Sequence, residues 1–153
     1  MAKRAGVSHA APAHHFGDAA GLLTALAAEG FRQFLAAQAA REARAAPDPA
    51  SQLVAAGLGY VDFAIGRPAL FRLLWQSERP DFGNAELGQA ARAAFQHLVD
   101  QVMAAGGRST ADEAAAWAMA HGLADLLASG RLESVGSLSP EARDAMVAGL
   151  IRR

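Results

Sequence analysis

The sequence predicts an all-α protein, and three observations carry this prediction. Alanine is the commonest of the 153 residues, and it loses no side-chain entropy when it enters a helix. Proline, glycine and small polar residues interrupt the chain at places where helices typically begin and end. No stretch alternates apolar and polar residues in the manner of a half-buried strand. One helical domain with a small N-terminal appendage fits this length.

The first long helix is expected over residues 18–45, with Asp18 as its N-cap and apolar residues at helical spacing. Pro47-Asp48-Pro49 interrupts it, and Asp48 is expected to cap a second helix with Pro49 in its first turn. Gly66-Arg67-Pro68 ends that helix and begins a short third one.

The second half of the chain divides in the same way. Residues 80–83 are expected to form a loop, and a long helix runs from Asn84 to about Ala105 before a Gly-Gly pair. Thr110-Ala111-Asp112-Glu113 matches a capping box and opens a helix to about Ser129. Ser139-Pro140 caps a last helix that continues almost to Arg153.

Composition narrows the protein class. No run of about 18 apolar residues occurs, so we expect no membrane-spanning helix and no membrane partner. The sequence has no cysteine, which excludes disulfides and thiolate chemistry. No long apolar segment follows the first basic residues, so we expect no signal peptide and a cytoplasmic location.

Residues 2–16 have the features of an incomplete helix-turn-helix. Gly6 stands where a short helix would end, and Ser8 could cap the next one. No acidic residue precedes Asp18, which suits contact with DNA phosphates. A solvated, frayed terminus explains the same residues. The basic and polar residues available for DNA binding are Lys3, Arg4, Ser8, His9, His14 and His15.

Two groups of residues resemble the TetR family of bacterial transcription regulators. The first group is Ala2-Lys3-Arg4-Ala5-Gly6-Val7-Ser8, followed by His15-Phe16 and Leu22-Leu23. The second is Phe63-Ala64 and Arg67 to Leu73, followed by Trp117, His121 and Gly122. This second group is similar to the TetR-type C-terminal domain that is named after its Trp, His and Gly.

The resemblance implies three parts: a remnant of the DNA-binding head over 1–17, a connecting helix over 18–45, and a ligand-binding and dimerisation domain over 46–153. Family members usually have one more helix before the position of Met1, so the head is expected to be short. Ala13 and Ala19 stand where the family usually has a tyrosine and a lysine that contact the DNA backbone.

A ligand pocket is expected between the helices of the C-terminal part. Trp117 and His121 are four residues apart and share a helix face, while Gly122 would let a neighbouring helix approach. An ordinary core explains the same pattern, with a buried Trp117 packed on a His121 that is hydrogen-bonded internally. The candidate pocket residues are Tyr60, Phe63, Phe71, Trp75, Trp117, Met119 and His121. Gln76, Gln96 and His97 are further candidates for its polar part.

Helices 110–129 and 140–152 are expected to pair with their copies across a two-fold axis, because in the resembled family they form a four-helix bundle. Closure of a monomer is the alternative. The candidate interface residues are Ala114, Ala118, Leu123, Leu127, Met146, Val147 and Leu150.

The expected function is a TetR-like DNA-binding regulator, a repressor that responds to a small hydrophobic ligand. Its partners are operator DNA, the small-molecule effector and a second copy of the chain. The alternative is a ligand-binding homodimer that has lost DNA binding. We expect no enzymatic activity and no cofactor, because phosphate-binding and nucleophile-elbow motifs are absent from the sequence. The spacing of His9, His14 and His15 does not suit a helical metal site.

Overall fold

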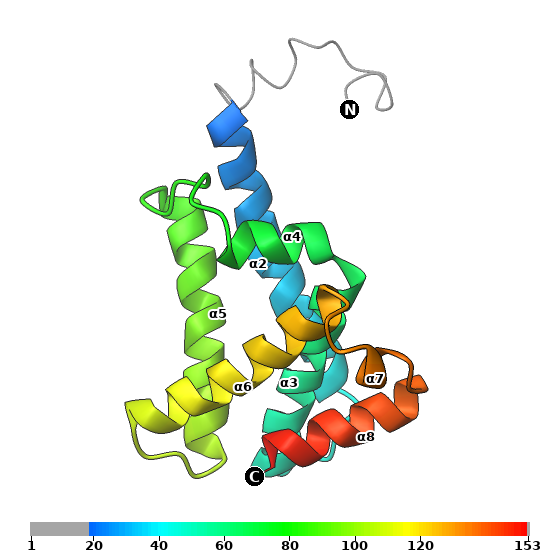
Figure 1. Cartoon of the computed structure of the whole chain (residues 1–153). Coiled ribbons are helices and arrows are strands. Elements are labelled where there is room, and N and C mark those ends of the chain that lie inside the picture. The colour runs from blue at the N-terminus through cyan, green and yellow to red at the C-terminus, as the bar shows by residue number, and fades with distance from the viewer. Residues whose placement is uncertain (1–18, 153) are drawn as a thin grey trace.

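The computed structural model describes residues 19–152, which form helices and no strand (Figure 1). The all-α prediction is therefore confirmed over this range. The helices are α2 (Ala19–Glu42), α3 (Pro49–Gly66), α4 (Pro68–Trp75), α5 (Ala85–Ala104), α6 (Thr110–Ala128), α7 (Glu133–Gly136) and α8 (Pro140–Ile151).

Helix boundaries follow the predicted signals closely. Asp48 caps α3 by accepting a hydrogen bond from the Ser51 amide at 2.9 Å, and Pro49 occupies the first turn. Asn84 caps α5 and Ser139 caps α8 through the same type of bond. Gly130 has a φ of 71°, the left-handed conformation that commonly follows the end of a helix, here α6. The predicted Asp18 cap lies outside the described residues.

The structure differs from the predicted local structure in two places. The capping box at α6 begins one residue earlier than expected, since Ser109 is the N-cap and Asp112, not Glu113, bonds back to the Ser109 amide at 3.0 Å. The short helix α7, between α6 and α8, was not predicted. It has no buried residue, so no apolar pattern marks it in the sequence.

The core is built around α2 and α3, which lie side by side and pack on each other extensively (Figure 1). Helix α5 covers α2, whereas α6 and α8 cover α3. Gly59 makes the α2–α3 approach possible, because a Cβ atom at this position would lie 2.5 Å from the Cα of Gln38. The side chains of Phe63, Phe71 and Leu87 are among those fully buried between these helices.

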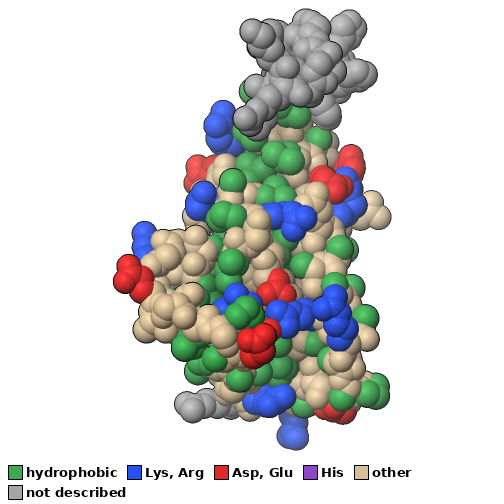
Figure 2. All heavy atoms as spheres, turned by 90° about the vertical axis from the view of Figure 1, so that its right-hand side faces the viewer, with side chains coloured by type: hydrophobic (Ala, Val, Ile, Leu, Met, Phe, Trp, Pro, Cys, Tyr) green, Lys and Arg blue, Asp and Glu red, His purple; other side chains and the backbone are tan. Residues whose placement is uncertain are grey.

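The surface is mixed in character. Figure 2 shows the side of the molecule that carries α7 and α8, where hydrophobic side chains lie between acidic and basic ones. Among the described residues, no single helix is long and apolar enough to cross a membrane. The consecutive helices α3 and α4 pass that test only as a pair, and they are bent by 110° at the break between them.

Candidate ligand cavity

A cavity of about 250 Å³ opens between α2, α3, α4, α5 and α6. Among the described residues that line it, none is charged, and most are aromatic or aliphatic. Three of the lining side chains, those of Phe82, Phe95 and Trp117, are large and exposed. The lining residues are Phe31, Phe34, Gln38, Tyr60, Leu74, Trp75, Phe82, Ala91, Ala94, Phe95, Leu98, Trp117 and Ala120.

Trp75 is the centre of an aromatic cluster in the wall of the cavity. Its ring stacks on Tyr60 at a centroid distance of 5.3 Å and meets Phe34 edge to face at 5.1 Å. Phe31 contacts the same indole at 5.6 Å, also edge to face. Such ring pairs stabilise by about 0.5–1.5 kcal/mol beyond their burial. The cluster therefore holds the apolar wall in a defined shape and joins α2, α3 and α4.

A polar chain runs through this aromatic wall. The Tyr60 hydroxyl lies 2.9 Å from Nδ1 of His121 and accepts a hydrogen bond from the Trp117 indole at 3.4 Å. Because an indole N–H can only donate, the phenol hydrogen is left for the His121 nitrogen. The His121 ring also stacks on Phe71 at 5.3 Å.

The chain consists of neutral groups. Burial lowers the pKa of His121 below its ordinary value, and the nearby Asp125 carboxylate only partly opposes this effect. Burial also raises the pKa of the Tyr60 phenol well above its ordinary value, although the bond from Trp117 acts in the opposite direction. At neutral pH we therefore expect an uncharged imidazole bonded to an uncharged phenol.

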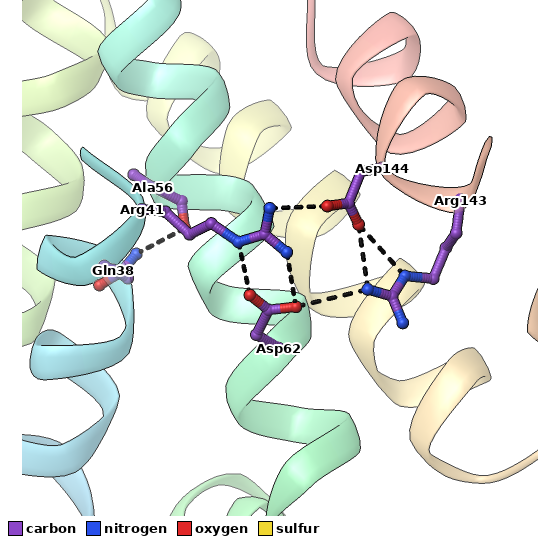
Figure 3. A network of polar contacts seen from close by, with 6 residues as sticks. All are labelled: Gln38, Arg41, Ala56, Asp62, Arg143 and Asp144. Atoms are coloured by element: carbon purple, nitrogen blue, oxygen red, sulfur yellow. Dashed lines mark hydrogen bonds and ion pairs between the residues drawn. The ribbon is translucent and has the colours of Figure 1, made fainter. Parts of the chain in front are cut away.

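Gln38 is the polar side chain of the lining that the sequence did not single out. It is only 6% exposed, and its amide nitrogen donates to the Ala56 carbonyl oxygen at 3.2 Å. Figure 3 shows the nitrogen facing Ala56 and the oxygen facing away from it. The Gln38 Oε1 atom is buried and has no hydrogen-bond partner among the described residues.

The predicted pocket residues fall into three groups. Tyr60, Trp75 and Trp117 line the cavity, and His121 contacts it through Tyr60. Phe63 and Phe71 are 1% exposed and form the core behind the lining. Met119 is 41% exposed and lines a separate, open depression of about 500 Å³ between α3, the end of α5, α6 and α8.

The alternative interpretation of Trp117 and His121 as ordinary core holds only in part. His121 is hydrogen-bonded internally, as that interpretation expected, but Trp117 is 40% exposed rather than buried. A Cβ atom at Gly122 would meet nothing within 4 Å, so this glycine does not serve a close helix approach inside the protomer.

Three further polar candidates have partners elsewhere. Gln76 donates to Asp125 at 2.7 Å, and Gln96 donates to Asp100 at 2.8 Å. The His97 ring lies 2.7 Å from Glu42 and links α5 to the end of α2. None of the three lines the cavity.

Sequence reasoning missed the contribution of α2 and α5 to the lining. Phe31 and Phe34 belong to the apolar residues of the first predicted helix, and an aromatic pair three residues apart on that helix was a visible signal. Phe95 and Leu98 on α5 have the same spacing. Their role depends on how α5 packs against α2, which periodicity alone does not show.

Other predicted sites have mixed outcomes. All six candidate DNA-binding residues lie outside the described range. Ala114 and Ala118 are exposed on α6, and Leu127, Met146 and Leu150 are half-buried. Leu123 and Val147 are enclosed in the core of the protomer, so they are not surface residues that a partner could contact. Among residues 19–152, no group of three or more candidate ligands could hold a metal ion.

A network of four charged side chains lies on the other side of α3 and joins α2, α3 and α8 (Figure 3). Arg41 binds both oxygens of Asp62, at 2.6 and 3.0 Å, and also contacts Asp144 at 2.6 Å. Arg143 completes the network through Asp144 at 3.0 Å. Burial alone would raise the pKa of Asp144, but the bonds from the two arginines lower it below its ordinary value.

Comparison with known proteins adds two findings. Residues 53–153 match the model of a family described as "Tetracyclin repressor-like, C-terminal domain". The chain is also similar to a solved structure of a protein with unknown function from Rhodococcus sp. RHA1, with a TM-score of 0.77 and 30% sequence identity. That alignment covers 99% of this chain and 80% of the other. Curated proteins provide no match.

Proposed function

The chain belongs to the family of tetracyclin repressor-like C-terminal domains, and we propose that it is a ligand-responsive transcription regulator that works as a homodimer. In this proposal a small hydrophobic molecule binds in the cavity, and residues 2–16 take part in binding operator DNA. Ligand binding then releases the DNA, as expected of a repressor.

The position of the cavity against α2 is the observation that carries this proposal. Phe31, Phe34 and Gln38 on α2 form part of the lining, and α2 is the helix that follows the N-terminal segment. A ligand in the cavity therefore contacts the helix that connects the two parts of the chain. It can shift the position of that helix if it binds one arrangement better than the other.

The chemistry of the lining supports a small apolar ligand. Binding sites for small molecules are mostly apolar, with a few placed polar groups, and this cavity has that composition. Its volume of about 250 Å³ is below the range that is usual for drug-sized ligands. A charged ligand would lose its hydration without gaining a counter-charge from these residues.

The outer faces of α6 and α8 support the homodimer. Ala114 and Ala118 are exposed, and added Cβ atoms at Gly122 and Gly149 would meet nothing within 4 Å. Small residues on two neighbouring helices let the backbones of a second copy approach closely. A two-fold dimer would also match the symmetry of a palindromic operator.

The proposed binding to DNA is tested by an electrophoretic mobility-shift assay with the DNA upstream of the gene and the chain of 153 residues. We expect a shifted band that 4-propylphenol or 4-propylanisole, two small neutral aromatic probes, reverses. Binding of the probes is followed independently by thermal denaturation and by the fluorescence of Trp75 and Trp117, which both line the cavity.

Two exposed residues of α5 provide matched variants for this experiment. Phe95→Ala removes a side chain that is 49% exposed and lines the cavity, so we expect weaker probe binding without loss of the fold. Met103→Ala removes one that is 48% exposed and lies outside the lining, and should leave probe binding unchanged. Probe binding without any DNA shift would favour a ligand-binding homodimer that does not contact DNA.

A further inference from the structure

We propose that the ligand of this cavity is a neutral molecule with an apolar, aromatic-compatible body and one hydrogen-bond donor, an O–H or N–H, that bonds to Oε1 of Gln38. This inference rests on the proposed ligand-binding function and states what the ligand must present. Three observations carry it: an acceptor without a partner, a lining without charge, and the arrangement of two adjoining cavities.

The acceptor is the Gln38 side-chain oxygen. Gln38 is 6% exposed, and its Oε1 atom has no hydrogen-bond partner among the described residues. Its amide cannot be turned over without loss, because Nε2 donates to the Ala56 carbonyl at 3.2 Å and a flip would bring two oxygens together. The backbone of α3 thus fixes the oxygen as the free end of the amide (Figure 3).

A buried acceptor without a donor is unfavourable and rare in folded proteins. A ligand that supplies the donor removes the free-energy cost of the unpaired oxygen. A ligand with only acceptors leaves the oxygen unpaired. The other polar atom of the inner wall, the Tyr60 hydroxyl, is already bonded to His121 and Trp117. The geometry therefore favours donation to Gln38 over donation to Tyr60.

The shape of the site places the donor at one end of the ligand. A smaller cavity of about 30 Å³ adjoins the larger one, and Gln38, Tyr60, Leu98 and Ala120 line both. A space of this size holds one group of about the size of a water molecule. The Oε1 atom has almost no accessible surface, so the donor reaches it only when side chains around the two cavities rearrange. The apolar body then fills the 250 Å³ cavity.

The test compares 4-propylphenol, 4-propylanisole and propylbenzene, which share a ring and a propyl chain but differ in their hydrogen-bonding group. Dissociation constants come from calorimetry, with tryptophan fluorescence as a second readout. The unchanged chain should bind the phenol more tightly than the anisole by about 10-fold, as expected for one hydrogen bond to an otherwise unpaired acceptor.

Gln38→Met keeps the length of the side chain and removes the acceptor, so the preference for the phenol should disappear while the anisole still binds. The matched control is Gln33→Met, on the same helix but outside the lining, which should keep the preference. We also expect Gln38→Met to melt at a higher temperature than the unchanged chain, because it removes the unpaired oxygen.

The possible outcomes separate the two proposals. Equal binding of phenol and anisole by the unchanged chain would overturn the assignment of the donor and leave the ligand-binding function standing. Binding of none of the three probes would count against both. A phenol preference that survives in Gln38→Met would overturn the role of Gln38. If the variant does not fold, the comparison in the unchanged chain still tests whether the ligand donates a hydrogen bond.

Discussion

At the scale of single residues, Tyr60 shows how the hydrogen bonds of a buried polar group are satisfied within an aromatic wall. Tyr60 is 6% exposed, yet its hydroxyl has both a partner that accepts and one that donates, His121 and Trp117. Each partner comes from the same helix, α6, one turn apart. The two bonds therefore join α6 to α3 in addition to the packing of these helices.

Tyr60→Phe should destabilise the protein by about 1 kcal/mol, because it leaves the buried side of His121 without its partner. Urea denaturation measures this loss, and the aromatic packing of the ring is retained in the variant. Trp117→Phe is the companion variant, and it should cost less because the bond that it removes is long, at 3.4 Å, and the indole is 40% exposed. A larger loss for Trp117→Phe would contradict this ranking.

The pH dependence of stability should carry the signature of His121. Its pKa in the folded protein is lowered by burial, so the unfolded chain takes up a proton more readily than the folded one. The contribution is fully present above the unfolded pKa, about 6.5, and is lost as the pH falls through the lower folded pKa.

Denaturation between pH 7.5 and 5 tests this prediction by comparing the unchanged chain with His121→Gln. We expect the unchanged chain to lose more stability over that interval, since the variant has no imidazole at this site. Parallel pH profiles for the two proteins would show that His121 does not titrate differently on folding.

The residues of the cavity could be predicted from the sequence only in part. Tyr60, Trp75 and Trp117 were expected because aromatic residues at helical spacing mark an apolar face. Gln38 was not, because a glutamine in a long amphipathic helix is ordinarily exposed. It is buried here because Gly59 lets α3 approach the backbone of α2 at this position.

At the scale of the helices, the close contact between α2 and α3 leaves no room for a side chain at position 59. A Cβ atom at Gly59 would lie 2.5 Å from the Gln38 Cα and 2.7 Å from the Ala37 carbonyl oxygen. These are backbone atoms and cannot rotate away. Gly59→Ala should therefore separate the helices and destabilise the protein by about 1–3 kcal/mol, despite the better helix propensity of alanine.

Gly66→Ala is the matched control, since it lies on the same helix and its added Cβ would meet nothing within 4 Å. Thermal denaturation of both variants gives the comparison. We expect a lower melting temperature only for Gly59→Ala, together with weaker probe binding because the wall of the cavity shifts. Equal melting temperatures would mean that Gly59 does not determine how closely the two helices approach each other.

The charged network on the opposite side of α3 should couple α2 to α8. Arg41 bonds to Asp62 and Asp144 with side chains that are about one-third exposed or less, and Arg143 shares both carboxylates. A double-mutant cycle of Arg41→Met and Asp144→Asn should give a coupling of about 1 kcal/mol, larger than that of most surface pairs.

The control pair is Glu29 and Arg32 on the outer side of α2, where the side chains are 47% and 50% exposed. Salt and water screen this pair more strongly, so its coupling should be smaller and should fall further in about 1 M salt. A coupling for Arg41 and Asp144 no larger than that of the control would show that the network does not tie α8 to α2.

The boundaries of the helices were the most predictable feature of the chain. Pro49, Pro68 and Pro140 all fall in the first turn of a helix, where the missing N–H costs nothing. The capping box at α6 was displaced by one residue because Ser109 and Thr110 are adjacent and both can cap. The local sequence does not show whether Ser109 or Thr110 is the N-cap, because that depends on the path of the loop before α6.

At the scale of the whole molecule, the packing of the helices determines what the apolar residues do. Residues such as Val147 and Ala118 lie on helices with similar patterns, yet one is enclosed in the core and the other is exposed. Helices α6 and α8 each have an inner face that packs on α3 and an outer face rich in small residues. The order of the helices along the chain did not reveal which face was which.

The outer faces lead to a prediction about assembly. Ala118→Arg places a long charged side chain on the exposed face of α6, where it should not disturb the protomer but should block close approach of a second copy. Light scattering at micromolar concentration should therefore give a dimer for the unchanged chain and a monomer of about 15.8 kDa for the variant.

Ala93→Arg adds the same charge to an exposed position on α5, outside the two outer faces, and should remain a dimer. Because both variants exchange an exposed alanine for arginine, a difference between them is attributable to position and not to charge or solubility. A monomer in the unchanged chain would overturn the proposed homodimer, and a dimer in Ala118→Arg would move the interface away from this face of α6. Circular dichroism of the variants ensures that the comparison is between folded proteins.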